Sequence, residues 1–301
     1  MRIAAFLGVK DEVELIGPCL AHLRAIGVDH IIACDSRSTD GTRDILAAQS
    51  GGDLELVDFD DRAGEQAEAA LLADIVARAR AAGADRLIYS DADEFWLPAT
   101  GRLRDLADLA APAQLAVARF NVVLAPAGPA IPLPAAGAGL TPADHARILM
   151  FTAPPRPGEA AEPDWIATPP RRKLIVPPAL IRNTRAGHHH AEPEPGVDLP
   201  RLAPADLVIA HVPFSSPERF ARKVANIRAA LDRHGHEWGP GVAAHWRAWA
   251  DLDPAAEFAR NRRDADQIRA LRAAGRISSA ADWLARAARA AQAAGRRQGG
   301  K

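Results

Sequence analysis

The first hundred residues alternate between short apolar runs and stretches in which apolar residues recur at helical spacing. Buried strands are expected where an apolar run is bounded by turn residues, at residues 2–9, 31–34, 54–57 and 86–90. Helices are expected where the spacing is helical, at residues 16–26, around 45–46 and at 65–82, and Gly27 and Gly83 supply helix stops. The order is therefore β-α-β-α-β-α-β.

This alternation places the chain in the α/β fold class. Short connections between alternating strands and helices predict a mainly parallel sheet covered by helices on both faces. Right-handed crossovers bring the carboxyl ends of the strands to one edge of the sheet, and open α/β sheets bind their ligands at that edge. Polar residues that directly follow the strands are therefore the first candidates for a functional site.

The pattern changes after residue 110. Residues 125–170 are dense in Pro, Ala and Gly with little periodicity, which is typical of a lid or binding loop. Further strands are expected at 111–120, 174–176 and 207–210, and helices from Pro217 onward and at 243–251, 254–274 and 279–293. We interpret residues 1–214 as an α/β domain with halves at 1–110 and 111–214, followed by a C-terminal helical region at 215–301.

Composition and charge exclude several classes of protein. The chain has 301 residues, 48% of them hydrophobic, which is enough for one large core or two smaller ones. A net charge of −1 gives no overall attraction to nucleic acid or anionic lipid. No apolar stretch approaches the ~20 residues that span a bilayer. A cytoplasmic protein is expected, with peripheral attachment to the inner face of a membrane left open, and Cys19 and Cys34 are expected to be buried thiols.

Asp91 and Asp93 give the strongest chemical signal. They follow the fourth expected strand and are one residue apart, so in an extended segment both carboxylates point the same way. Two such carboxylates can bind one hard divalent ion, Mn²⁺ or Mg²⁺, together with diphosphate or ribose oxygens. The competing interpretation is an acidic turn that caps the next helix, because an isolated D-x-D pair is common by chance.

Two more carboxylates are expected at the same edge of the sheet. Asp35 ends the second strand, where it can accept hydrogen bonds from a nucleobase or ribose, or can hold its own loop in an Asx-turn. Glu12 follows the first strand and is either a similar contact or an acidic residue at a helix N-terminus.

Three segments in order resemble the successive motifs of glycosyltransferase family 2: Val9-Lys10-Asp11-Glu12, Asp35 to Thr42, and Asp91-Ala92-Asp93-Glu94-Phe95-Trp96. The nearest version is the branch with a D-x-D-E-F signature, itself similar to glycosyltransferase family 92. The resemblance is good over residues 3–100 and loose beyond them. It implies a GT-A fold, a nucleotide-sugar donor (often a UDP-sugar) and inversion at the anomeric carbon. Residues 1–110 would then form the donor-binding half and 111–214 the acceptor-side half.

The resemblance also implies roles for single residues. Gln66, at the start of the helix that borders the donor site, is a weaker donor contact. The chain departs from the family pattern at Asp11, where Asn is usual, and at Arg37. The matching positions imply these contacts: Glu12 and Asp35 with the nucleoside, Asp91 with the ribose or metal ion, and Asp93 with the metal ion.

A histidine late in the core often completes the metal site of such enzymes. His189 and His211 are both candidates, since imidazole is a common ligand of transition metals. Alternatively, His189 belongs to a solvated loop and His211 is a hydrogen-bonded residue at the core edge. The segment from Arg171 to Val176, followed by a G-x-H at residues 187–189, resembles the family's late core segment and favours His189. Lys173 could neutralise the diphosphate, or it could belong with Arg171 and Arg172 to a solvated basic face.

An inverting transfer also needs a carboxylate that takes the proton of the acceptor hydroxyl. Asp164 beside Trp165 is the candidate, because a sugar can stack on the indole while the carboxylate acts at its edge. Asp144 and Glu159 are rivals, and each of these acids can equally be an ordinary loop residue.

Two other functions compete with glycosyl transfer to a glycan or glycolipid acceptor. A phosphatase of the haloacid dehalogenase kind also uses a D-x-D pair, but its pair usually lies on the first strand and is followed by Thr or Val. Here Glu94 and Phe95 follow, after the fourth strand. A catalytically inactive nucleotide- or carbohydrate-binding module with the same fold is the other alternative.

Overall fold

The computed structural model describes residues 1–134, 137–154, 164–235 and 244–298. The strands are β1 (Ile3–Val9), β2 (His30–Asp35), β3 (Leu54–Asp58), β4 (Arg86–Asp91), β5 (Glu94–Pro98), β6 (Gln114–Asn121), β7 (Leu124–Ala125), β8 (Gly128–Pro129), β9 (Leu149–Phe151), β10 (Lys173–Val176), β11 (Ile181–Thr184), β12 (Ala191–Pro193), β13 (Arg201–Leu202), β14 (Leu207–His211) and β15 (Ile277–Ser279). The α-helices are α1 (Ile16–Ala25), α2 (Thr42–Gln49), α3 (Glu65–Ala81), α4 (Pro217–His234), α5 (Ala244–Ala250), α6 (Pro254–Asn261), α7 (Ala265–Ala273) and α8 (Ala280–Gln298). Short 3₁₀ turns lie at Leu103–Asp105, Ala107–Ala110, Pro142–Arg147, Pro178–Leu180 and Ala186–His188.

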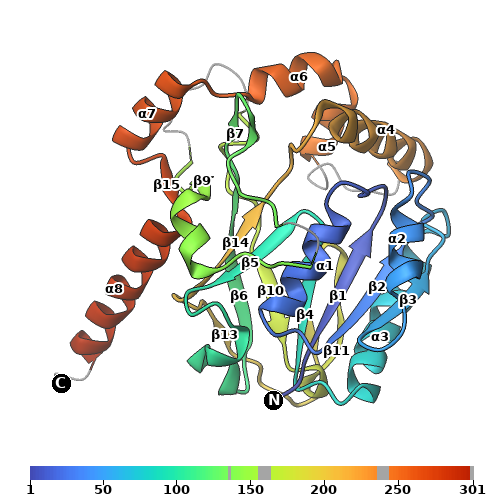
Figure 1. The fold of residues 1–301 in the computed structure, drawn as a ribbon. Helices are drawn as coiled ribbons and strands as arrows, with labels where there is room; N and C mark the ends of the chain where they lie inside the picture. The colour runs from blue at the N-terminus through green and yellow to red at the C-terminus, as the bar shows by residue number, and fades with distance from the viewer. Residues whose placement is uncertain (135–136, 155–163, 236–243, 299–301) are drawn as a thin grey trace.

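One large sheet organises the molecule (Figure 1). Its strand order is β3-β2-β1-β4-β10-β6-β14-β5, and β13 pairs with β6 outside this path. The strands β3, β2, β1 and β4 are parallel, as are β6 and β14, whereas β10 runs antiparallel to both of its neighbours and β5 antiparallel to β14. The expected α/β class with a mainly parallel sheet is confirmed.

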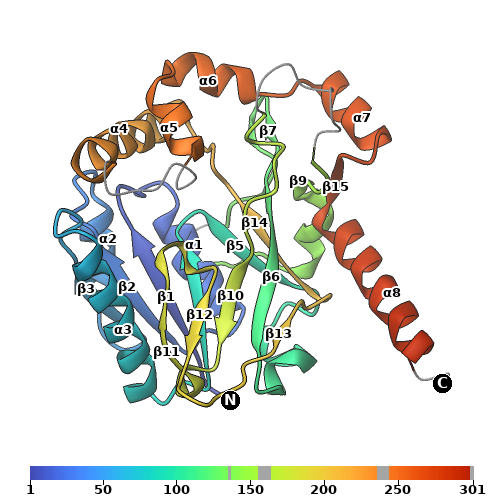
Figure 2. The ribbon, with the colours of Figure 1, turned by 180° about the vertical axis from the view of Figure 1, so that it is seen from behind.

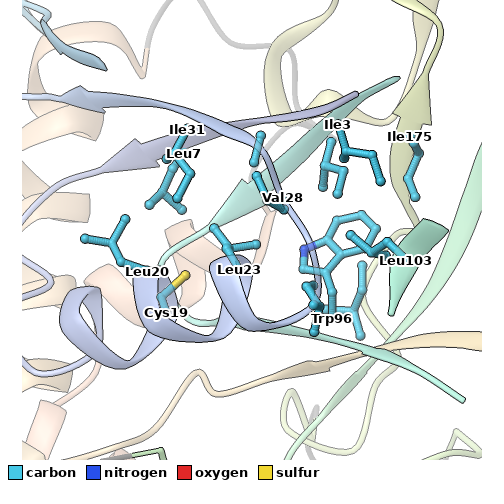
Figure 3. Packing of buried hydrophobic residues seen from close by; sticks show 14 of the residues in the cluster. Ile3, Leu7, Cys19, Leu20, Leu23, Val28, Ile31, Trp96, Leu103 and Ile175 are labelled. Atoms are coloured by element: carbon cyan, nitrogen blue, oxygen red, sulfur yellow. The ribbon is translucent and has the colours of Figure 1, made fainter. Parts of the chain in front are cut away.

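Helices cover both faces of the parallel part of the sheet. On one face, Ile16, Leu20 and Leu23 of α1 pack with Leu7 and Ile31, in the cluster shown in Figure 3. On the other face, the buried side of α3 packs against β1, β2 and β4 through Leu72, Ile75, Val76 and Ala79. Continuous apolar strands are the expected consequence of burial on two faces. Both cysteines are buried free thiols, as expected.

Three segments differ from the sequence-based expectation. β5 was not expected, because it begins directly after Asp93 with no turn residue to separate it from the D-x-D segment. The helix expected at 254–274 is two helices, α6 and α7, since Asp264 starts α7 with a capping box to Gln267. Residues 125–170 contain β7, β8 and β9, and β9 pairs with β15 near the C-terminus.

The C-terminal helices lie in two places. α4, α5 and α6 sit beyond the carboxyl ends of β1 and β4, whereas α8 runs away from the sheet in both views (Figures 1 and 2). Within the described ranges, no helix combines the length and apolar character that crossing a membrane requires. The helices above the strand ends are therefore the part of this region that can contribute to a site there.

Candidate functional site

The carboxylates singled out in the sequence meet at one edge of the sheet because three parallel strands end there. Val9 at the end of β1 is in register with Asp35 at the end of β2, and Gly8 is in register with Asp91 at the end of β4. Glu12 lies in the turn that follows β1. The topology therefore brings these acidic residues together, as right-handed crossovers predict.

The loops after β1 and β2 are tied together by side chains. Oδ1 of Asp11 accepts the backbone N–H of Thr39 at 2.7 Å, and the backbone N–H of Glu12 donates to Oγ1 of Thr42 at 2.8 Å. Asp11 and Arg37, the two departures from the family pattern, both have positive φ, of 52° and 61°. Asp is one of the few non-glycine residues enriched in this left-handed conformation, so Asp11 can stand where the family has Asn.

Asp91 is neutralised by basic residues from the neighbouring strands. Lys173 Nζ of β10 donates to its Oδ2 at 2.8 Å, and Arg119 Nη1 of β6 lies 3.8 Å from the same oxygen. Glu94 is fully buried behind them, where it is paired with Arg119 and accepts the backbone N–H of Asp91 at 3.1 Å. Two acids and two bases thus form a compact network at the end of β4.

The environment separates the pKa values of these two acids. Burial would raise the pKa of Asp91, but Lys173 and Arg119 outweigh it and lower the pKa to about 2. Burial dominates for Glu94 and raises its pKa to about 7, although Lys173 and Arg119 oppose the rise. Asp91 is therefore an anion at neutral pH, and Glu94 ionises less readily than Asp91.

Asp93 is neutralised from a helix rather than from the sheet. Nη2 of Arg219 and Nζ of Lys223, both on α4, each donate to its Oδ2 at 2.8 Å. Burial opposes ionisation of Asp93, but Lys223, His211 and Arg219 hold its pKa well below the usual range. Its side chain is only 4% exposed, so these partners substitute for water.

Arg219 connects Asp93 to the loop after β1. Its Nε and Nη2 donate to the two carboxylate oxygens of Glu12 at 2.6 and 2.8 Å, which is the bidentate geometry that makes such pairs strong. Its Nη1 donates to the carbonyls of Val212 and Pro213 at 3.1 and 3.3 Å. Arg219 is 1% exposed, and its position is fixed by these contacts.

His211 faces Asp93 with an acceptor nitrogen. The amide nitrogen of Asn121 lies 3.0–3.2 Å from the carbonyls of Trp165, Ile166 and Thr168, so the amide oxygen must point toward His211 Nδ1, 2.6 Å away. Nδ1 therefore carries the proton and Nε2 a lone pair. Nε2 is 3.5 Å from Oδ1 of Asp93. Burial lowers the pKa of His211 to about 4, although Asp93 opposes the fall.

This donor set fits a divalent ion. Carboxylate oxygens of Asp91 and Asp93 and an imidazole nitrogen suit Mn²⁺, and a histidine whose other nitrogen is held by an amide is a usual metal ligand. Among the described residues, no group of three His, Cys, Asp or Glu side chains is already arranged as a metal site. The basic residues now contact the oxygens that an ion would need, so binding requires a rearrangement.

A hollow of about 550 Å³ lies one turn further along α4 from Lys223, the residue that contacts Asp93. Asp35, 1% exposed, contributes a buried Oδ1 that has no hydrogen-bond partner in the described structure, while its Oδ2 accepts the N–H of Ser38 at 3.1 Å. α4 contributes Asn226, Ala229 and Arg233 to the lining. The other lining residues are Lys10, Arg37, Ser38, Thr39, Arg43, Asp58, Asp61 and Arg62.

The remaining site candidates lie elsewhere. His189 Nδ1 contacts the carbonyl of Arg172 at 2.7 Å, whereas His211 Nε2 lies 3.5 Å from Asp93. The position of His211 beside Asp93 favours it over His189, against the sequence-based preference. Gln66 is exposed on the first turn of α3. Both oxygens of Asp164 accept from Arg263 Nη2, at 3.0 and 2.8 Å. Asp144 closes the capping box of a 3₁₀ turn with Thr141, and Glu159 lies outside the described residues.

Sequence reasoning missed four residues of the acidic site: Arg119, Asn121, Arg219 and Lys223. Arg219 and Lys223 are four positions apart and so lie on one face of α4. Phe220, Val224 and Ile227 form the buried apolar stripe of α4, and Arg219 directly precedes Phe220. A basic residue beside such a stripe is the signal that could have revealed it.

No protein-family model and no curated protein matches the chain. Among solved structures, residues 1–349 of S. aureus TarS in complex with UDP are 13% identical, with 86% of this chain and 71% of that chain covered and a TM-score of 0.38. The mannosyltransferase PcManGT from Pyrobaculum calidifontis, in complex with GDP-Man and Mn²⁺, is 15% identical, with 97% and 80% covered and a TM-score of 0.38.

Glucosyl-3-phosphoglycerate synthase from Mycobacterium tuberculosis, in complex with Mn²⁺, UDP and glucosyl-3-phosphoglycerate, is 20% identical over 31% of this chain and 34% of that chain, with a TM-score of 0.23. Likenesses with such TM-scores identify neither a family nor an activity. The functional conclusion therefore rests on the geometry of this chain's own residues.

Proposed function

We propose that this chain is a GT-A glycosyltransferase that moves a sugar from a nucleotide-diphosphate donor to an acceptor hydroxyl, with a divalent metal ion. The observation that carries the proposal is that α4 joins the D-x-D segment to a hollow: Lys223 contacts Asp93, and Asn226 lines the hollow in which buried Asp35 has an oxygen without a partner among the described residues. A nucleotide-sugar has a nucleobase at one end and a charged diphosphate next to the sugar, and this site offers a partner for each.

Asp35 would bind the base. Its buried Oδ1 lacks a hydrogen-bond donor in the described structure, and a buried acceptor without a partner costs about 1–3 kcal/mol. The N3–H of uracil is a donor of the right kind, which supports a UDP-sugar. Glu12 would act through the loops around the nucleoside, because Arg219 contacts both of its carboxylate oxygens. Gln66 would contribute a peripheral donor contact.

Asp91, Asp93 and His211 would hold the divalent ion. That ion would stabilise the negative charge of the departing nucleoside diphosphate. Lys173, 2% exposed and fixed on β10, would add a second positive charge on the diphosphate side. Asn121 would keep the Nε2 lone pair of His211 directed toward the ion, as its amide oxygen does now.

The transfer itself would invert the anomeric carbon. The acceptor oxygen forms a bond to that carbon as the bond to the diphosphate oxygen breaks, and a carboxylate takes the acceptor's proton. Asp164 is the proposed base, which requires it to exchange its ion pair with Arg263 for the acceptor hydroxyl. We propose a glycan or glycolipid as the acceptor.

Calorimetry of UDP binding with and without Mn²⁺, on wild type and Asp93→Asn, tests the proposal. We expect Mn²⁺-dependent binding that is weakened at least about 10- to 100-fold in the variant, because the loss of an outer-shell partner alone typically has that cost. Asp105→Asn, at an exposed position, is the matched control and should bind as wild type does. UDP release from a UDP-sugar then separates an enzyme from an inactive binding module. Failure of UDP and of other nucleoside diphosphates to bind would refute the proposal.

A further inference from the structure

The two basic residues on Asp93 are held very differently. Arg219 is 1% exposed and donates to Glu12, to Asp93 and to two backbone carbonyls. Lys223 is 25% exposed, and within the described part of the chain its hydrogen-bond partner is Asp93 alone. An ammonium group on a flexible four-carbon stem can change partners without moving the helix. Lys223 is therefore the cation that can leave Asp93.

Lys223 also lies where a diphosphate would pass. One turn further along α4, Asn226 lines the hollow beside Asp35, and Ala229 and Arg233 follow on the same face. One turn before Lys223, Arg219 contacts the D-x-D segment. The helix thus runs from the acidic pair to the hollow, and Lys223 is the residue between them.

The charges of the site are balanced before any ligand binds. Four carboxylates, of Glu12, Asp91, Asp93 and Glu94, face four basic side chains, of Arg119, Lys173, Arg219 and Lys223, so the formal sum is zero. A divalent ion alone would add two positive charges beside Asp93, whose side chain is 4% exposed, and a diphosphate alone would add about two or three negative ones. The two together restore the balance.

We propose that Lys223 is a resident counter-ion, which neutralises Asp93 in the nucleotide-free protein and transfers to the donor's diphosphate when Asp93 becomes a metal ligand. This inference rests on the proposed function. Its consequence is that Lys223 opposes metal binding in the absence of nucleotide and supports nucleotide binding in the presence of metal. The two ligands therefore bind cooperatively, and each raises the affinity of the other by the same factor.

The test measures Mn²⁺ binding to the nucleotide-free protein by electron paramagnetic resonance, and UDP binding at saturating Mn²⁺ by calorimetry. For Lys223→Met, we expect Mn²⁺ to bind roughly 5- to 100-fold more tightly than to wild type, and UDP to bind more weakly by a similar factor. Lys223→Arg keeps the charge and should keep the wild-type pattern. Arg222→Met removes a charge from the same helix at a residue that contacts Glu14, and should leave Mn²⁺ affinity unchanged.

The outcomes separate this inference from the proposed function. If wild type binds UDP with Mn²⁺ but Lys223→Met binds Mn²⁺ no more tightly than wild type, the counter-ion role is refuted and the proposed function stands. If Arg222→Met tightens Mn²⁺ binding equally, the effect is one of net charge and the inference is also refuted. If wild type binds neither ligand, both proposals fail.

Discussion

Asp91 and Asp93 stand one residue apart, yet their counter-ions come from different parts of the molecule. Lys173 and Arg119, on strands of the central sheet, hold Asp91. Arg219 and Lys223, on a helix that follows the sheet in the chain, hold Asp93. A sheet strand fixes its side chains through neighbours on both sides, whereas a helix above the sheet edge can present one fixed and one exchangeable cation. The comparison teaches that Asp91 has partners held by the sheet, whereas Asp93 has one fixed and one exchangeable partner.

The largest expected effect, on the free energy of unfolding, comes from replacing Arg219, the buried cation that α4 provides to Asp93. Arg219→Met should lower the free energy of unfolding by about 3–5 kcal/mol, because Glu12 and Asp93 lose a buried partner. Lys173→Met, on the sheet side, should cost less, since the Asp91 side chain is 40% exposed and water can replace the lysine there. Denaturant titration of both variants measures the difference. Equal losses of unfolding free energy in Arg219→Met and Lys173→Met would contradict this difference between the helix partner of Asp93 and the sheet partner of Asp91.

His22 is a buried histidine outside the candidate site. Its contribution to the free energy of unfolding is a reference value for contacts that do not change partners. His22 lies between the carbonyl of Trp96 and the N–H of Leu140, and burial lowers its pKa to about 4. Because this is below the unfolded value of about 6.5, the unfolded chain binds the extra proton, and the stabilisation is present above pH 6.5 and lost as the pH falls through 4.

The pH effect can be isolated with a variant. Between pH 7 and pH 4, the free energy of unfolding of wild type should fall by about 3 kcal/mol more than that of His22→Asn, which has no titrating ring. Denaturant titrations at several pH values give both curves. Parallel curves would contradict the assignment of this pH dependence to His22.

A smaller effect is expected from the amide that orients His211. Asn121→Ala removes the acceptor of His211 Nδ1 and should weaken Mn²⁺ binding in the presence of UDP by about 10- to 100-fold, as loss of an outer-shell partner does. Asn183→Ala, whose amide contacts the carbonyl of Ala69, is the matched control. An unchanged Mn²⁺ affinity in Asn121→Ala would contradict the proposal that His211 is a ligand of the metal ion.

Gln66 is the position where the smallest effect is expected. Because its side chain is exposed on the first turn of α3, Gln66→Ala should leave the free energy of unfolding within ~0.5 kcal/mol of wild type. The loss of one peripheral hydrogen bond should weaken UDP binding by about 0.5–1.5 kcal/mol, measured by calorimetry. A loss of UDP affinity as large as that in Asp93→Asn would show that Gln66 makes a central contact with the donor and not a peripheral one.

The acids of the site could be predicted from the sequence, whereas their partners could not. Asp35 and Asp91 end strands that local apolar patterns reveal, and the crossover rule brings those strand ends together. Arg219 is 126 residues from Asp93 and 207 from Glu12, and no local pattern states that it will meet them. Only the position of α4 above the sheet edge decides this.

Local sequence patterns do not reveal contacts between distant residues, and this also explains where the observed fold differs from the expected one. β1 to β4 and the helices between them were predictable because each carries its own periodicity and its own stop signal. β5 was missed because it pairs with β14, which lies more than a hundred residues further along the chain. The separation of α6 from α7 depends on a capping box at Asp264, a signal that the helical periodicity of the segment concealed.

The contacts of Arg219 also bear on the order in which the molecule matures. During synthesis, the strands β1 to β4 and their acidic loops leave the ribosome long before α4 does. Until residues 217–234 arrive, Glu12 and Asp93 have no counter-ion from the helix, and like charges at the sheet edge repel one another. Contacts across 126 and 207 residues close slowly. The loops after β1 and β4 therefore gain their final arrangement only when about three quarters of these 301 residues have been made.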